Sequence, residues 1–287
     1  MLTLLFDGIA YGMLLYLMAI GLSITMGLMN FINLAHGAFA MVGGYALVLL
    51  MQHAGWPFLL CVPVAFVLTA CLGLVLEVTL YRRMYDKPHL DQVLFSIGLT
   101  FMAVAAVDFA VGSTQQLVQL PDYLKGRTEW WDGALGMGHY RLAIIGVCVV
   151  LAFALQWLLV NTRYGAQLRA AVDDRTVASA MGIPVNTIFM TTFALGSGLA
   201  GLGGALGAEV LGLDPVFPLK FMVYFLIVVA VGGTSSLTGP MLAALLLGIA
   251  DVAGKYYVPK LGAFIVYAVM VLVLMWRPQG LFARSNA

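Results

Sequence analysis

The sequence contains 287 residues, of which 62% are hydrophobic and only 9% are charged, and its formal net charge is +1. About a quarter of the residues in a soluble domain are charged, so this composition, with a mean hydropathy of +1.00, excludes an ordinary soluble protein and predicts an integral membrane protein. The basic residues are scattered and form no stripe that could neutralise phosphates, so no nucleic acid partner is expected.

Apolar stretches that could cross a membrane follow one another from the N-terminus. A spanning helix needs about 20 apolar residues, and the predicted spans lie at about 8–29, 38–51, 57–80, 92–112, 142–160, 187–211, 221–250 and 261–276. The polar segment 232–240 divides the seventh stretch into two halves, which are expected to form two short crossings or a re-entrant pair. The predicted fold class is an all-α polytopic membrane protein with about 8–9 transmembrane helices, including broken or re-entrant segments, in a single domain over residues 1–287.

The lysine and arginine residues indicate the orientation, because they accumulate in short cytoplasmic loops. They gather in segments 81–91, 161–186 and 277–287, which we assign to the cytoplasmic side. In segment 113–141 the basic residues are matched by acidic ones and accompany two adjacent tryptophans, so this segment is assigned to the outside. Counting from these anchors predicts an outer N-terminus and a cytoplasmic C-terminus.

The first polar constellation lies at 26–41, in the sequence MGLMNFINLAHGAFAM. Asn30, Asn33 and His36 stand three residues apart and Gly37 follows, and polar groups of this kind are costly in hydrocarbon unless they are paired or face water. The apolar run after them is too short to cross unless the polar stretch enters the membrane with it. A helix broken at depth, whose polar groups line a cavity, fits both observations. The alternative is a short cytoplasmic turn whose side chains cap two helices.

The second constellation, at 162–184, is a loop by hydropathy but is helical by content. We predict one short amphipathic helix at about 167–181, with Gly165 before it and Gly182 at its end. It combines apolar with charged residues, among them Ala171, Ala178, Arg169, Asp173, Asp174 and Arg175. The four charges cancel, whereas helices on a lipid surface usually carry an excess of Lys and Arg. We therefore favour docking into a partner protein over the alternative of lying on the membrane surface.

Three isolated carboxylates, Glu77, Asp108 and Glu209, fall within predicted spans but near their ends, where we expect them to be solvated or paired. No chain of acids crosses the middle of the membrane, which argues against a proton-coupled or sodium-coupled carrier. The motifs of nucleotide-binding loops, zinc proteases and serine hydrolases are missing from the sequence. We expect a transport subunit that is not an enzyme, with no cofactor or metal of its own.

Four segments resemble the permeases of ATP-binding-cassette importers for branched-chain amino acids, a family that also includes urea and amide permeases. They are GLSITMGLMNFINLAHGAFAMVGGY at 21–45, RYGAQLRAAVDDRTVASAMGIPVN at 163–186, VGGTSSLTGPMLAALLLG at 231–248 and RPQGLF at 277–282. The resemblance covers nearly the whole chain, and the four segments occur in the expected order.

The resemblance implies a type II importer fold in the bacterial inner membrane. It implies a second permease subunit, usually a different chain, together with two cytoplasmic ATPase subunits that use ATP and Mg, and a periplasmic solute-binding protein. The remaining surface would contact membrane lipid. Energy would then reach this chain from its partners.

The resemblance also suggests roles for individual residues. The substrate pathway would include Asn30, Asn33, His36 and Gly37. The cytoplasmic loop at about 161–186 would hold the coupling helix, with Gly165, Arg169, Ala170, Ala171, Asp173, Asp174, Ala178 and Gly182.

The sequence departs from the family at one position that bears on the solute. Many members carry an acid directly after the His-Gly pair, where this sequence has Ala38. The expected solutes are branched-chain or other small amino acids. Urea, amides or small carboxylates are the alternative within the same importer class, and an ion-coupled secondary transporter is the alternative outside it.

Overall fold

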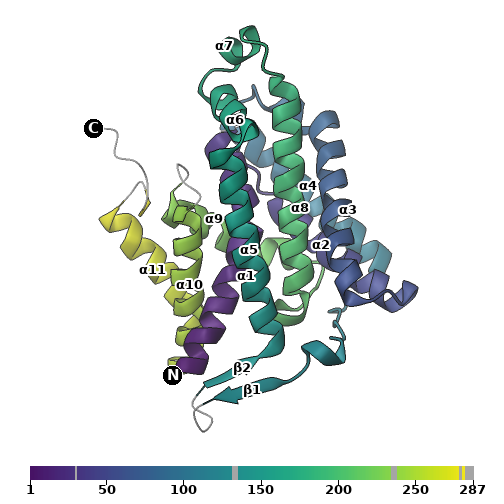
Figure 1. The fold of residues 1–287 in the computed structure, drawn as a ribbon, viewed down its shortest axis with the longest axis vertical. Helices are drawn as coiled ribbons and strands as arrows, with labels where there is room; N and C mark the ends of the chain where they lie inside the picture. The colour runs from purple at the N-terminus through teal and green to yellow at the C-terminus, as the bar shows by residue number, and fades with distance from the viewer. Residues whose placement is uncertain (30, 131–134, 234–237, 278–279, 282–287) are drawn as a thin grey trace.

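The computed structural model describes the chain except for residues 30, 131–134, 234–237, 278–279 and 282–287 (Figure 1). Within the described residues, seven helices are long and apolar enough to cross a membrane, and two shorter apolar helices accompany them. The seven are α1 (Leu2–Leu28), α2 (His36–Ala54), α3 (Phe58–Thr79), α4 (His89–Val111), α5 (His139–Asn161), α8 (Val185–Leu211) and α10 (Thr238–Tyr257). The shorter two are α9 (Phe217–Gly232) and α11 (Gly262–Trp276). These helices confirm the predicted all-α polytopic membrane fold.

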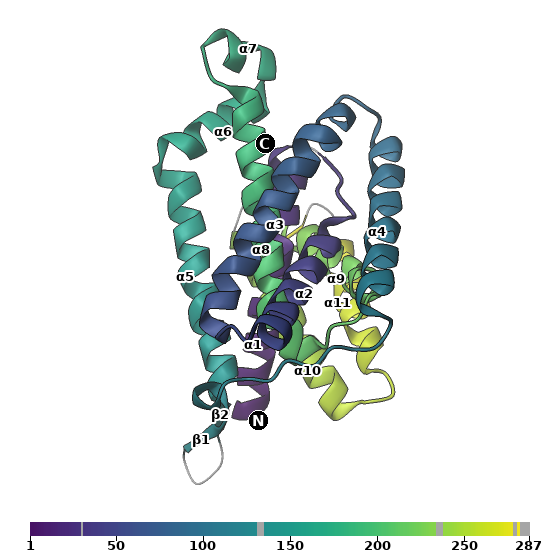
Figure 2. The same cartoon turned by 90° about the vertical axis from the view of Figure 1, so that its right-hand side faces the viewer.

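Helices α1 and α8 lie at the centre of the bundle, where α2, α3 and α10 pack against them (Figures 1 and 2). Glycines allow this close approach. A methyl group on Gly12 of α1 would lie 2.7 Å from the carbonyl oxygen of Ala244 in α10, and one on Gly43 of α2 would overlap the backbone of Gly201 in α8. Small residues at such contacts let membrane helices pack through their backbones.

The outer helices present apolar side chains to their surroundings. Phe109 of α4, Phe153 of α5 and Leu272 of α11 are 95%, 72% and 67% exposed. Large apolar side chains exposed on this scale mark a surface that contacts lipid or other proteins. The surface of the bundle thus fits a membrane environment.

Two polar structures mark the opposite ends of the bundle. One end carries the N-terminus and an antiparallel hairpin of β1 (Arg127–Trp130) and β2 (Leu135–Gly138), in which Arg127 pairs with Gly138 (Figure 1). The other end carries α6 (Arg163–Asp173), α7 (Arg175–Ala180) and the 3-10 helix η1 (Tyr81–Met84) (Figure 2). Segments 113–141 and 161–186 therefore lie at opposite ends, as the charge pattern predicts, and we call these the outer and the cytoplasmic end.

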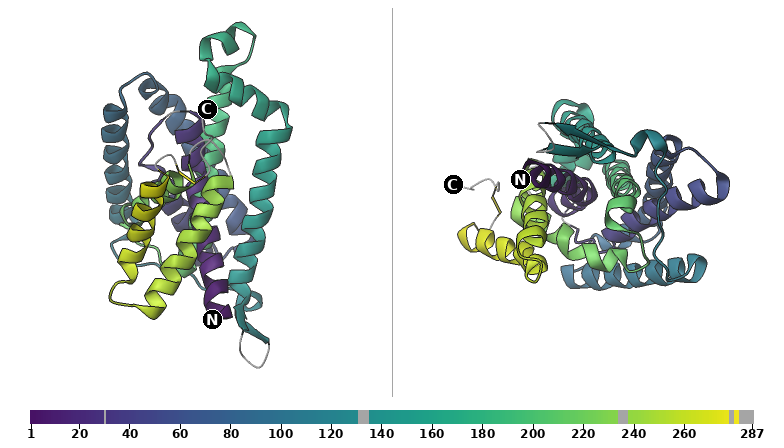
Figure 3. Two further views of the ribbon diagram at one scale, coloured as in Figure 1. Left: turned by 90° about the vertical axis from the view of Figure 1, so that its left-hand side faces the viewer. Right: turned by 90° about the horizontal axis from the view of Figure 1, so that it is seen from below.

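The divided apolar stretch forms a hairpin of unequal helices, in which α9 packs against α1 and α2 and α10 packs against α1, with α11 beside them (Figure 3). Helix α9 has 16 residues and is about 24 Å long at 1.5 Å per residue, short of the ~30 Å hydrocarbon core, whereas α10 has 20 residues. The end of α9 meets the start of α10, since a methyl group on Gly232 would lie 2.5 Å from the backbone nitrogen of Pro240. The middle of the predicted polar tip, residues 234–237, lies outside the described residues.

Candidate functional site

The chain between α1 and α2 enters the bundle without helical structure. His36, the first residue of α2, places its Nε2 atom 2.9 Å from the backbone oxygen of Met18, in the middle part of α1. Asn33 and His36 are 0% and 2% exposed. The unwound segment therefore lies inside the bundle. It is not the predicted break within one helix: α1 runs from the outer to the cytoplasmic end, and α2 runs back to the outer end, where Gln52 Nε2 donates to the backbone oxygen of Leu117 at 3.3 Å (Figure 2). Asn30, which the sequence places in the same constellation, lies outside the described residues.

Polar side chains of α4 satisfy the backbone of this unwound segment. The N–H of Ile32 donates to Gln92 Oε1 at 3.2 Å, and the N–H of Leu34 donates to Ser96 Oγ at 3.1 Å. The hydroxyl of Thr100 donates to the backbone oxygen of Leu34 at 3.5 Å. Non-helical backbone is tolerated at membrane depth only where partners of this kind replace the missing helical hydrogen bonds.

Gln92, Ser96 and Thr100 are functional candidates that the sequence reasoning missed. They are 1%, 0% and 1% exposed and stand at intervals of four along α4. Residues at this spacing share one helix face. The polar stripe was visible in the sequence, but its partner was not, because the unwound segment precedes it by about 60 residues.

Asn33 fixes the shape of the break. Its Oδ1 atom accepts hydrogen bonds from the N–H of Ala35 and from the hydroxyl of Tyr81, both at 3.1 Å. Its Nδ2 atom is buried and has no hydrogen-bond partner among the described residues. Asn33 thus caps the approach to α2 and at the same time ties the break to η1.

Gly37 lets α9 approach the start of α2. A methyl group on Gly37 would lie 3.1 Å from both the Cα and the backbone oxygen of Pro218, in the first turn of α9. The ring of His36 lies 6.4 Å from that of Phe225, also in α9. His36 and Gly37 therefore lie where α1, α2 and α9 meet, and Asn33 lies just before them, next to η1.

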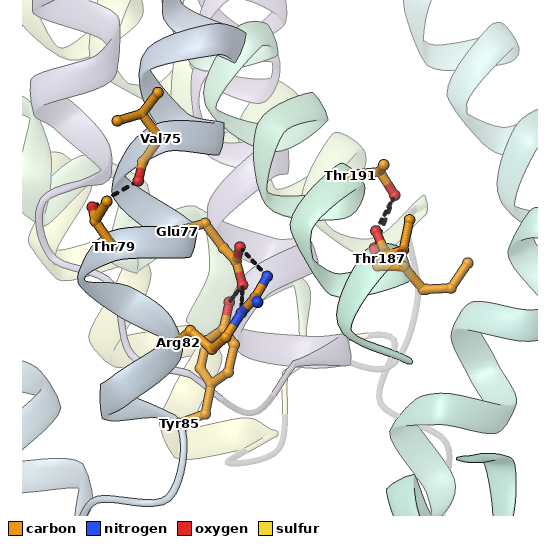
Figure 4. A network of polar contacts seen from close by, with 8 residues as sticks. Val75, Glu77, Thr79, Arg82, Tyr85, Thr187 and Thr191 are labelled. Atoms are coloured by element: carbon orange, nitrogen blue, oxygen red, sulfur yellow. Dashed lines mark hydrogen bonds and ion pairs between the residues drawn. The ribbon is translucent and has the colours of Figure 1, made fainter. Parts of the chain in front are cut away.

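Glu77, at the end of α3, is the centre of a buried polar cluster next to η1 (Figure 4). Its carboxylate is 3.1 Å from Arg82 Nη2 and accepts a hydrogen bond from the Tyr85 hydroxyl at 3.2 Å. Burial, together with the negative charge of Glu77, raises the pKa of Tyr85 well above its ordinary value, so this hydroxyl stays protonated and donates. The expectation of a paired Glu77 is confirmed.

The other two predicted carboxylates are also paired or solvated. Asp108 accepts a hydrogen bond from the Ser113 hydroxyl at 2.6 Å, and Glu209 is exposed. One buried acid had not been singled out: Asp251 of α10 is 1% exposed.

The predicted single helix at 167–181 is wrong, because the chain forms α6 and α7 with a break at Asp174. Asp174 has an extended backbone, and its Oδ1 atom accepts hydrogen bonds from the N–H groups of Thr176 at 2.8 Å and Val177 at 3.0 Å. A side chain that caps a helix start in this way favours a new helix over continuation of the old one. Gly165 lies inside the first turn of α6, which Thr162 caps, and does not precede the helix.

Three of the small residues predicted for coupling lie inside the chain. Gly165, Ala171 and Ala178 are buried, so they hold α6 and α7 against the bundle. Val177 and Met181, by contrast, are 54% and 76% exposed at the cytoplasmic end. The apolar surface that a partner could reach on α7 and its end is therefore formed by Val177, Ala180 and Met181, as the sequence predicts. The remaining predicted coupling residues are at least partly exposed: Arg169, Ala170, Asp173, Asp174 and Gly182.

Arg175, the first residue of α7, connects the cytoplasmic end to the interior. Its guanidinium carbon lies 4.6 Å from the ring centroid of Phe189 and 5.4 Å from that of Tyr85. Cations at this distance over an aromatic face are attracted by its electrons. The carboxylate oxygen Oδ1 of Asp86 also lies 3.8 Å from Arg175 Nη1.

Aromatic rings continue this connection to the unwound segment between α1 and α2. The ring of Tyr85 lies 5.6 Å from that of Phe31, in the unwound segment, and Phe31 lies 5.5 Å from Tyr81, which donates to Asn33. Edge-to-face pairs at these distances add to the energy of simple burial. We call Arg175, Tyr85, Phe31, Tyr81 and Asn33 the aromatic chain. It joins the two predicted sites, which lie about 140 residues apart in sequence, through direct contacts.

Comparison with protein families and known proteins gives a consistent result. Residues 4–274 match the model of the family described as branched-chain amino acid transport system / permease component. The chain is 27% identical to the high-affinity branched-chain amino acid transport system permease protein LivH of Escherichia coli K12, over 98% of this chain and 95% of LivH. It is 25% identical to the corresponding protein BraD of Pseudomonas aeruginosa, over 98% of this chain and 95% of BraD.

A second permease protein of the same Escherichia coli system also matches. LivM is 24% identical, over 96% of this chain and 69% of LivM. No solved structure matches the chain.

Proposed function

Because this chain belongs to the family of branched-chain amino acid transport system permease components, we propose that it is the membrane subunit of an ATP-driven importer for branched-chain or other small amino acids. As a member of this family it is a multi-pass membrane permease, and we place it in the bacterial inner membrane. Its proposed partners are a second permease, two cytoplasmic ATPase subunits and a periplasmic solute-binding protein. The similarity to both LivH and LivM supports a pair of different permease chains.

The observation that carries the mechanism is the aromatic chain from α7 to the unwound segment. In the proposed cycle, ATP and Mg are bound by the ATPase subunits, which contact Val177 and Met181 and move α7. Arg175 transmits that movement to Tyr85 and Phe31, and Tyr81 transmits it to Asn33. Packed elements of this kind switch between discrete arrangements when a partner favours one of them.

The unwound segment is suited to respond. Its backbone is held by side chains of α4 and not by a helical ladder, so a shift of Gln92 or Ser96 can exchange one set of hydrogen bonds for another. The start of α2, with His36 and Gly37, would move with it. This motion would expose the polar groups of the break to one side of the membrane and then to the other.

ATP-dependent uptake by the reconstituted complex tests this proposal. The chain would be co-purified with its partners, which identifies them, and placed in vesicles with the solute-binding protein. We expect uptake of L-leucine, L-isoleucine or L-valine that requires ATP and stops when the ATPase subunits carry a substitution in their nucleotide-binding loop. Uptake of urea, small amides or small carboxylates in place of amino acids would contradict the proposed solute class. Uptake without ATPase subunits would contradict the importer class.

A further inference from the structure

A cavity of about 420 Å³ lies among five helices near the outer end of the bundle. Its lining comes from α1, α5, α8, α9 and α10. Asp7 and Arg141 stand near the starts of α1 and α5, and Lys255 stands near the end of α10. The cavity is separate from the unwound segment at Asn33 and from the proposed docking surface on α7.

Part of the cavity wall is apolar. Leu14 of α1, Ile144 of α5, Leu211 of α8 and Phe221 of α9 all line it. A volume of this size, with apolar side chains in one part of the wall and polar groups in another, is typical of small-molecule sites. This wall could receive an aliphatic side chain.

The charged groups of the cavity form a specific pattern around Asp251. Lys255 Nζ is 2.6 Å from Asp251 Oδ2, and it lies 5.7 Å from the ring centroid of Tyr11. Arg141 pairs with Asp7, and Lys220, which also lines the cavity, pairs with Asp214. The cavity thus contains both signs of charge close together.

Among the described residues, Asp251 has a carboxylate oxygen without a hydrogen-bond partner. Asp251 is 1% exposed, and its Oδ1 atom is buried with no hydrogen-bond partner among the described residues. A buried carboxylate oxygen without a donor is costly, and native proteins normally satisfy it. Lys255, whose side chain is 53% exposed, keeps donors free, because an ammonium group has three and the bond to Asp251 uses one.

We propose that this cavity is an outer binding site for an aliphatic α-amino acid in its zwitterionic form. The ammonium group of the ligand donates to Asp251 Oδ1, and its carboxylate accepts from Lys255 Nζ. An α-amino acid carries its two charges one carbon atom apart, as the adjacent Asp251 and Lys255 side chains require. The aliphatic side chain lies against the apolar wall. This inference rests on the proposed transport of amino acids and adds a site to it.

The test is binding of radiolabelled L-leucine to the purified complex of permeases and ATPases, without the solute-binding protein. Two competitors each lack one charge: 4-methylpentanoate lacks the ammonium group and L-leucinamide lacks the carboxylate. We expect each to compete about 10- to 100-fold less well than unlabelled L-leucine, because one hydrogen bond between charged groups is lost.

Substitutions assign each ligand charge to one residue. Asp251→Asn should weaken L-leucine binding by about 10- to 100-fold and leave the affinity for 4-methylpentanoate unchanged. Lys255→Gln should weaken L-leucine binding similarly and leave L-leucinamide unchanged. Because Lys255 is half exposed, its substitution is the deciding variant if Asp251→Asn does not assemble.

Matched controls come from an ion pair in the outer loop. Lys125 and Asp122 lie 2.8 Å apart, and both are exposed outside the cavity. Lys125→Gln and Asp122→Asn should leave binding of all three ligands unchanged.

The results separate this site from the transport function. If the complex imports leucine with ATP but Lys255→Gln does not change leucine binding, the proposed site is wrong and the proposed function is still supported. Equal losses for all three ligands in both variants also overturn the site, because they indicate general damage. A complex that imports no amino acid refutes the proposed function, whereas the ligand-specific losses would still support the site.

Discussion

The Asn33 side chain fixes the conformation of the unwound segment between α1 and α2. Its Oδ1 atom serves two donors, the N–H of Ala35 and the hydroxyl of Tyr81, and the residue is fully buried. In a hydrocarbon environment no water is present to accept hydrogen bonds from these donors in place of Asn33. The amide is therefore part of the structure as well as a candidate for the substrate pathway.

Replacement of Asn33 should destabilise the permease. Asn33→Ala leaves two buried donors unsatisfied, at about 1–3 kcal/mol each, and we expect a lower midpoint of thermal unfolding in detergent. Tyr81→Phe is the matched control, since it removes one donor and leaves the bond to Ala35, and its cost should be near 1 kcal/mol. Asn33→Ala with the stability of wild type would show that the break does not depend on this amide.

Arg175 should affect coupling more than folding, because it lies at the boundary between α7 and the aromatic chain. Arg175→Ala removes the contacts with Phe189 and Tyr85, each worth about 0.5–2 kcal/mol. We expect ATP hydrolysis to continue while leucine uptake per ATP falls several-fold. Arg175→Lys keeps the charge but not the planar stacking, so an intermediate ratio is expected. An unchanged ratio of uptake to hydrolysis in Arg175→Ala would remove Arg175 from the proposed path.

At the level of elements, the separation of α6 from α7 divides two tasks. Helix α6 is held to the bundle by buried Leu168 and Ala171, and Arg169 donates to the backbone oxygen of Leu159 at the end of α5. Helix α7 begins at the cap formed by Asp174 and carries Val177 to the surface. Helix α6 thus anchors the segment to the bundle, and α7 exposes apolar side chains that a partner protein could contact.

A charge on the exposed surface of α7 should prevent docking without harming the fold. Val177→Glu combined with Met181→Glu changes only exposed side chains, so the permease should reach the membrane at its usual level. Burial of two unpaired carboxylates at an interface costs several kcal/mol, and we expect the ATPase to be lost in a pull-down. Leu90→Glu, at an exposed position near the start of α4, is the control and should retain the ATPase. Retention in the double variant would place the docking surface elsewhere.

At the level of the whole molecule, polarity separates the two ends and apolar surface covers the sides. The outer end carries the β hairpin and the N-terminus, whereas the cytoplasmic end carries α6 and α7 (Figure 1). The charged cavity lies near the outer end, among residues at the starts of α1 and α5 and the end of α10. A solute delivered from outside would reach the cavity first, and the ATPase subunits on the inside would contact α7. The unwound segment at Asn33 lies between the cavity and α7.

Accessibility of single cysteines should verify this polarity. In a background without Cys61, Cys71 and Cys148, an impermeant maleimide should label Lys125→Cys in intact cells. Ser179→Cys, on α7, should be labelled only after the membrane is opened, because the positive-inside distribution places this end in the cytoplasm. Labelling of Ser179→Cys in intact cells would invert the orientation.

The sequence by itself determined the class of fold, the number and order of the apolar segments, and the family. Helices in lipid must be long, apolar and internally hydrogen-bonded, so composition along the chain reveals them directly. The short apolar run at 38–51 also predicted that the polar stretch before it enters the membrane with it, and the contact of His36 with Met18 places the start of α2 inside the bundle.

Only the tertiary structure decided which side chains meet. The polar stripe on α4 has a structural role because Gln92 and Ser96 accept hydrogen bonds from the backbone of the unwound segment. Arg175 has one because its guanidinium lies over the rings of Phe189 and Tyr85. The break at Asp174 was missed because helix propensity varies little among the residues around it, whereas the cap is a local hydrogen bond. Ala171 and Ala178 were expected on a docking surface but are buried, because a small apolar residue suits either place and only packing distinguishes them. The spacing of residues in the sequence shows whether a helix face is polar or apolar. Which face of another helix it contacts is determined only when the helices pack together.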